Sequence, residues 1–362
     1  MIVFCKYLGC FTVLCISLLS CAVETQDRHG STSPSQVIEL DFPQDILFVD
    51  ELLVVASTGY DSEEWRAGRV DVYRVPSLEH VSQHVVSKYN PQHLYLDDDD
   101  ILVVNTGTYD FSDFDDPKAA TPGSIDRIKR DELLDNNSAQ ILHTFDKTVF
   151  PSPIDLTRLN ERQMGITSGL KPIFGILDET LSIQSMGPPG TTALGRFARW
   201  RDLTFIVDFN TDSAHVYDST NEHVCTLELG EFPNELEGAT TPVIDGDSLY
   251  YILALSGTLR RVPLDGNRPC SGRPTTVVAP LGQVPNDLHV KPDGLFVVHS
   301  ADNNLIQYDR RNGEEVNRYP LPLGSNPWAA AFSEDGRYIA VTEWATNQIT
   351  LIDRSSGQMN RL

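Results

Sequence analysis

The stretch GRYIAVTE at residues 336–343, followed by NQITLID at residues 347–353, decides the fold of this chain. Both are runs rich in apolar and β-branched residues, and a short polar turn separates them. Such a pair is typical of two neighbouring β-strands. The same unit of run, turn and second run recurs along the chain. Repeats of about 40 to 60 residues built only from strands predict a β-propeller, in which each repeat forms one blade.

Seven copies of this unit can be aligned. The second strands of the expected blades begin near Glu51, Asp100, Arg162, Asp202, Asp247, Gly294 and Arg337. The third strands begin near Arg69, Ser124, Ile173, Ser213, Thr258, Asn304 and Gln348. The offset is 10 or 11 residues in the last five copies and longer in the first two, which predicts insertions at Thr58–Gly68 and Thr106–Gly123. Blade three matches worst, so six blades is the alternative count.

We therefore predict an all-β protein whose residues 36–362 form one seven-bladed propeller of four-stranded antiparallel blades. A propeller has to close on itself, and the last blade is commonly completed by strands from both ends of the chain. Residues 37–40 form a short apolar run just ahead of the first blade. We expect this N-terminal strand to pair into blade seven and so leave only short, protected edges.

The N-terminus has the features of an export signal. Residues 1–6 form a short basic segment. The apolar run Tyr7–Leu19 that follows has 13 residues, which is too short to span a membrane as a helix. The run ends in LLSC, which resembles the bacterial lipobox and implies cleavage before Cys21 and lipid on its sulfur. We expect a signal peptide at 1–20, a lipidated tether at 21–35, and a lipid-anchored protein of the outer membrane or periplasm. An ordinary cleaved signal is the alternative.

The composition limits the partners. With 28 basic and 51 acidic residues the formal charge is −23, which repels phosphate backbones and argues against nucleic-acid binding. The excess acid is either a solvated coat or a means of attracting cations, with Ca²⁺ the one cofactor that the sequence brings forward. Cys225 and Cys270 are the two cysteines left in the folded body. In an exported protein they suggest one disulfide, although spacing alone does not establish it.

The last two blades resemble a known family. The residues PDGLFVV at 292–298 and SEDGRYIAVT at 333–342 are similar to the PDG-x-x-x-YVT-N repeat, and NQITLID with Ser356 and Gly357 is similar to its second half. On these motifs the chain resembles the YVTN-type, or YncE-like, bacterial seven-bladed propellers. The resemblance implies the fold, and export with a lipid anchor in some members, but no activity. The turn Glu343-Trp344 departs from the motif.

Candidate binding residues come from a pattern at the start of the innermost strands. Several blades begin with Pro, any residue, and then Asp or His, which places four polar side chains at one mouth of the central channel: Asp45, His93, Asp155 and Asp287. They can form a ligand site, and Asp155 with Asp287 is the pair considered for a metal. The structural alternative is that each Asp only caps its own backbone. No catalytic residue is assigned, although His93 is the candidate base.

The two insertions combine aromatic and acidic residues and should overhang the same mouth. Their exposed aromatic side chains are candidates for contact with a partner: Trp65, Tyr109, Phe111 and Phe114.

The sequence therefore favours a ligand-binding or protein-binding scaffold of the cell envelope, with an unknown envelope protein or small ligand as partner. The alternative is a metal-dependent, lactonase-like hydrolase. Gluconolactonase-like propellers hold a metal on Glu, Asn and Asp in such a channel, and Pro285-Asn286-Asp287 resembles one piece of that site.

Overall fold

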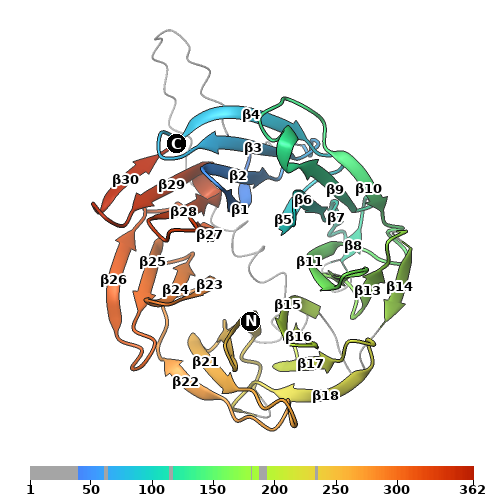
Figure 1. Ribbon diagram of the computed structural model, residues 1–362, viewed down its shortest axis with the longest axis vertical. Coiled ribbons are helices and arrows are strands. Elements are labelled where there is room, and N and C mark those ends of the chain that lie inside the picture. Colours follow the sequence, from blue (N-terminus) through green and yellow to red (C-terminus); the bar gives the residue numbers. More distant parts are fainter. Residues whose placement is uncertain (1–39, 61–63, 114–116, 181, 187–193, 233–234) are drawn as a thin grey trace.

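The computed structural model describes residues 40–362 except 61–63, 114–116, 181, 187–193 and 233–234. The predicted signal peptide, the tether and Cys21 lie outside the described residues. Seven four-stranded antiparallel sheets are arranged around a central axis, as Figure 1 shows, which confirms the predicted seven-bladed propeller. No described helix has the length and apolar character needed to cross a bilayer.

Each blade is one continuous stretch of chain that runs from the axis outward. The innermost strands are β1 (Pro43–Val49), β5 (Pro91–Asp97), β11 (Pro153–Asn160), β15 (Leu194–Trp200), β19 (Ala239–Asp245), β23 (Pro285–Lys291) and β27 (Pro327–Phe332). The second strands are β2 (Leu52–Ser57), β6 (Asp100–Asn105), β12 (Gln163–Ser168), β16 (Leu203–Asp208), β20 (Ser248–Leu253), β24 (Gly294–His299) and β28 (Tyr338–Glu343). Their starts agree with the predicted ones to within one residue.

The third strands are β3 (Arg69–Arg74), β9 (Ser124–Lys129), β13 (Phe174–Leu177), β17 (Ser213–Tyr217), β21 (Thr258–Pro263), β25 (Asn304–Tyr308) and β29 (Gln348–Asp353). The outermost are β4 (Glu79–Val85), β10 (Gln140–Thr144), β14 (Ile183–Met186), β18 (His223–Glu228), β22 (Thr275–Val278), β26 (Glu315–Pro320) and β30 (Gln358–Arg361). Two 3₁₀ turns, η2 (Arg130–Glu132) and η3 (Trp344–Thr346), and the hairpin β7 (Tyr109–Asp110) with β8 (Lys118–Ala119) complete the described elements.

The core lies between the blades. Seven clusters of buried apolar side chains each join two neighbouring blades. The second strand of a blade is therefore covered on both faces, and β2 and β16 are buried along nearly their whole length. This explains why these strands read as continuous apolar runs rather than as strict alternation. Blades four and five are also joined by a disulfide between Cys225 and Cys270, whose Cα atoms lie 6.3 Å apart.

The N-terminal strand predicted to close blade seven falls almost entirely on residues 37–39, which lie outside the described part. The four described strands of blade seven all come from Pro327–Arg361. Leu40 is not in a strand, but its side chain is buried between blades one and seven with Leu53 and Ile349. This side-chain packing contributes to the contact between blades one and seven. The C-terminal segment supplies β30, the outermost strand of blade seven.

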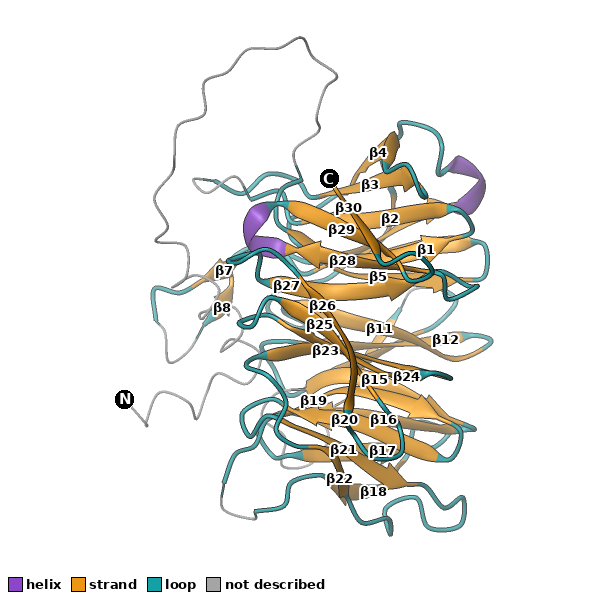
Figure 2. Ribbon diagram, turned by 90° about the vertical axis from the view of Figure 1, so that its left-hand side faces the viewer, coloured by secondary structure: helices purple, strands orange, loops and turns teal. Residues whose placement is uncertain are grey.

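The two faces of the propeller are built differently. We call the upper face the one that carries the connections between blades and those between second and third strands. The lower face carries the other turns. Both predicted insertions lie on the upper face, and the second contains the hairpin β7–β8, which projects from the left-hand side of Figure 2.

Candidate functional site

A β-bulge shapes the start of every innermost strand. In all seven blades the pairing with the second strand shifts register near this point. In five blades a proline begins the strand, and the residue before it has a positive φ, as in Phe42 (53°) and Asn90 (58°). Bulges commonly re-aim a side chain. Here they direct one residue of each blade toward the channel.

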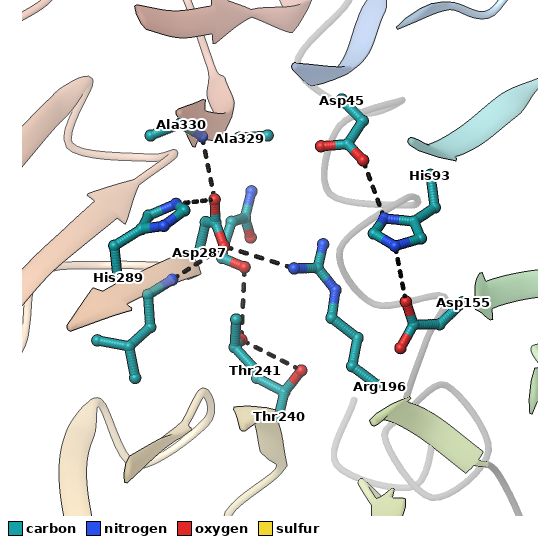
Figure 3. Close-up of polar contacts among 12 residues, drawn as sticks. Asp45, His93, Asp155, Arg196, Thr240, Thr241, Asp287, His289, Ala329 and Ala330 are labelled. Carbon is teal, nitrogen blue, oxygen red and sulfur yellow. Dashed lines mark hydrogen bonds and ion pairs between the residues drawn. The ribbon is translucent and has the colours of Figure 1, made fainter. Parts of the chain in front are cut away.

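The equivalent position in each blade defines a set that we call the channel ring: Asp45, His93, Asp155, Arg196, Thr240, Asp287 and Ala329. All seven are labelled in Figure 3, which shows the charged members pointing toward one another. The four residues predicted from sequence all belong to it.

Blades one to three contribute one continuous chain of contacts. The Nδ1 atom of His93 lies 2.9 Å from Oδ2 of Asp45, and its Nε2 atom lies 3.2 Å from Oδ1 of Asp155. Burial disfavours a charged imidazole, but the carboxylates of Asp155 and Asp45 outweigh it and raise the pKa of His93 above its ordinary 6.5. Both nitrogens are therefore engaged and protonation is favoured, so His93 is poorly placed to act as the free base considered from the sequence.

Blades four, six and seven form a second group. The Nη1 atom of Arg196 lies 3.4 Å from Oδ1 of Asp287, and Nε2 of His289 lies 2.9 Å from Oδ2 of the same carboxylate. Burial opposes the charge on Asp287, yet His289 and Arg196 together outweigh it and lower the pKa of this carboxyl well below its usual range. Blade five contributes only the uncharged Thr240 and Thr241 at this level.

The three ring carboxylates also bond to the neighbouring blade. Asp45 accepts the backbone N–H of Leu94 at 2.8 Å, and Asp155 accepts that of Phe197 at 2.8 Å. Asp287 accepts the N–H of Ala330 at 3.0 Å. In each pair the donor immediately follows the ring residue of the next blade. The sequence left open that each Asp only caps its own backbone. Asp45 and Asp287 do accept the N–H of the residue that follows them, Ile46 and Leu288. In addition, each of the three acids accepts a hydrogen bond from the next blade.

The arrangement does not fit a metal held by Asp155 and Asp287. Asp155 is bonded to His93 and to a backbone N–H, whereas Asp287 belongs to the separate group with Arg196 and His289. In the part of the chain that the structure describes, no group of three or more His, Cys, Asp or Glu side chains could hold a metal ion.

Arg196 and His289 are the two partners of Asp287 that sequence reasoning missed. Blade four lacks the Pro-x-Asp pattern, so its ring position was not recognised. A spacing could have found it: Arg196 precedes Asp208 by 12 residues, as Asp45 precedes Ser57, and both of these end a second strand. His289 lies two residues beyond Asp287, on the same side of β23.

The first insertion is anchored toward blade seven by its aromatic residues. Trp65 packs against Tyr60 with ring centroids 4.9 Å apart, and Tyr60 packs against Phe42 at 5.9 Å. Phe42 in turn contacts Trp344 at 4.7 Å. Trp65 is the outermost of these and is 37% exposed.

The second insertion leans the other way. The hydroxyl of Tyr109 accepts a hydrogen bond from Ser152 at 2.8 Å, at the start of blade three, and Phe111 packs on Tyr109 at 5.8 Å. Phe114 lies outside the described residues. Tyr109 and Phe111, which the sequence predicts as partner-binding residues, therefore also help to fix the insertion to the propeller.

Several exposed apolar side chains lie in connections of the upper face. They come from five different connections and include a phenylalanine that is 52% exposed and a leucine that is 94% exposed: Trp65, Val149, Phe232, Leu255 and Leu323. We call them the apolar rim. Exposed apolar groups on one face of a protein are a common feature of interaction surfaces.

The comparisons with known proteins identify the fold. No family model and no curated protein matches the chain. Among solved structures, virginiamycin B lyase from Staphylococcus aureus is similar over 85% of this chain and 95% of its own, with 12% identity and a TM-score of 0.65. A streptogramin B lyase matches over 90% and 95% of the two chains, with 11% identity and a TM-score of 0.64.

A protein assigned as a 6-phosphogluconolactonase from Bacteroides fragilis matches over 91% of this chain and 96% of its own, with 15% identity and a TM-score of 0.62. At such identities the similarity establishes a seven-bladed β-propeller and no activity.

Proposed function

We propose that the protein is an exported, lipid-anchored β-propeller of the bacterial cell envelope that binds a partner protein or ligand on its upper face. The observation that carries the proposal is the apolar rim, because five exposed apolar side chains lie in separate connections of the same face. The channel ring beneath supports a binding role over a catalytic one, since its acids are bonded to cations and backbone donors.

Export and lipid attachment rest on the N-terminal sequence and on the resemblance to YVTN-type propellers. They are tested by growing cells with an alkyne analogue of palmitate. The wild-type chain should be labelled and found with membranes, whereas Cys21→Ser should be unlabelled and released. Labelling of Cys21→Ser would contradict the anchor.

The binding surface is tested by photo-crosslinking in intact cells. A photoreactive phenylalanine analogue is placed at Leu323 or Phe232 on the apolar rim, and at Val316 or Val224 on outermost strands as matched exposed controls. We expect a discrete adduct from the rim positions and none from the controls. Adducts of the same size from all four positions would contradict an upper-face site.

A metal-dependent hydrolase is the second candidate, because solved structures similar to this chain include lyases and a protein assigned as a lactonase. The ring offers it limited support, since both nitrogens of His93 are occupied. Metal analysis of the purified protein, with a panel of sugar lactones assayed with and without chelator, tests this candidate. Hydrolysis that chelator abolishes and that Asp155→Asn and Asp287→Asn both remove would favour the enzyme.

A further inference from the structure

A groove of about 740 Å³ lies on the lower face, at the seam between blades one and seven. It is bounded by the turn between β1 and β2, the turn between β3 and β4, and the turn between β27 and β28. It is therefore on the side of the propeller opposite the apolar rim. Its size is in the range of sites that hold a few side chains or a small molecule.

The groove combines apolar and acidic lining residues. Apolar or aromatic groups come from Phe48, Val75, Pro76 and Tyr338. Four carboxylates come from the two turns on either side: Asp50, Glu51, Glu334 and Asp335. The one cation in the lining, Arg337, is paired with Asp353, with 2.9 Å between Nη2 and Oδ2, and lies over the Tyr338 ring. Its charge is thus already matched by a carboxylate that is not part of the lining.

The four carboxylates differ in their partners. Arg130 of blade two donates from Nη2 to both carboxylate oxygens of Asp50, at 2.5 Å to Oδ1 and 2.6 Å to Oδ2. Arg130 also attracts Glu334 electrostatically. Asp335 accepts hydrogen bonds from Ser333 and from the backbone of Arg337. Glu51 and Glu334 are exposed and form no ion pair with the described residues. The groove thus offers an apolar floor between two acidic sides.

We propose that this groove binds a basic segment of a partner protein, in which arginine or lysine residues flank an apolar one. The apolar side chain would cover Tyr338 and Phe48, and the cations would meet Glu51 and Glu334. Arg130 on Asp50 shows that a guanidinium already fits at this edge. Charge complementarity favours a cationic occupant, and the apolar floor favours a peptide over a bare polyamine.

The test uses fluorescence anisotropy with a short labelled peptide that alternates arginine with leucine. The groove variant is Glu51→Gln/Glu334→Gln. The matched control is Glu161→Gln/Glu222→Gln, which removes two exposed carboxylates from lower-face turns of blades three and four. Circular dichroism confirms that both variants keep the fold.

We expect the groove variant to bind the peptide about 5- to 10-fold more weakly and the control variant to change affinity by less than about 2-fold. A peptide with glycine in place of leucine should also bind more weakly to the wild type. Equal weakening by the two double variants would show that general acidity attracts the peptide and would overturn the proposal. Unchanged affinity for the glycine peptide would overturn the role of the apolar floor. Neither result bears on the upper-face site.

Discussion

In the half of the channel ring built by blades one to three the cation is His93, and in the half built by blades four to seven it is Arg196. His93 lies between two carboxylates and is 22% exposed at its side chain, whereas Arg196 meets one ring carboxylate at a longer distance and is 39% exposed. In the first half both ring nitrogens of His93 already contact ring carboxylates. The second, with Thr240 in place of a third charge, is the half where a ligand could compete for a charged group.

Removal of a ring acid should have the largest effect. Asp155→Ala and Asp287→Ala each remove partners from a buried backbone N–H and from a cation. Because an unpaired buried charge is costly, we expect each change to lower the free energy of unfolding by about 3 kcal/mol or more. Urea denaturation measures this loss. The exposed Asp99→Ala is the control, and a loss below about 1 kcal/mol would show that the acids do not join the blades.

Replacement of His93 should have the next largest effect, and it should depend on pH. The raised pKa means that the contact stabilises the folded state fully below the ordinary value of 6.5 and that this stabilisation is lost as pH rises through the folded value. We expect His93→Gln to cost about 1 to 3 kcal/mol near pH 5.5 and less near pH 9.

Urea denaturation of both proteins across this pH range gives the measurement. Asp287 does not interfere, since its lowered pKa affects stability only when pH falls below about 4. A difference between His93→Gln and wild type that grows with pH would contradict a protonated His93.

Arg196→Gln should be milder and should depend on pH less than His93→Gln does. The guanidinium stays charged, and exposure to solvent screens its attraction to Asp287, so we expect a loss of about 1 kcal/mol. Because Arg196 also lowers the pKa of His93 by repulsion, the losses at pH 5.5 and 8.5 should differ, but by less than those of His93→Gln. A pH dependence as strong as that of His93→Gln would remove the distinction between the two halves.

Thr240→Asp should have the smallest effect and the opposite sign. It would give Arg196 a second carboxylate, as Asp155 does for His93. We expect a gain of up to about 0.5 kcal/mol, measured by urea denaturation and absent when Arg196→Gln is combined with it. The same gain in the double variant would mean that the introduced carboxylate does not act through the guanidinium.

The sequence predicts most of the fold, because the second and third strands repeat at a nearly constant spacing and carry continuous apolar runs. The role of the apolar run at 37–40 could not be predicted this way, because an apolar run alone does not separate side-chain packing, as at Leu40, from strand pairing. The channel ring was predicted where Pro-x-Asp marks it. The ring position of Arg196 could not be predicted from this pattern, because its blade starts with Leu194-Gly195 and forms the same bulge without a Pro-x-Asp sequence.

In the part of the chain that the structure describes, each blade is one unbroken length of chain and no strand is exchanged between blades. The chain could therefore be reopened at a different connection and its present ends joined by a linker, with every sheet left whole. Such circular permutants should fold. The seam between blades one and seven, which the described residues join through the apolar cluster around Leu40 and a hydrogen bond from the Phe42 N–H to Asn347 Oδ1, should be the first place to part when the molecule is pulled from its two ends.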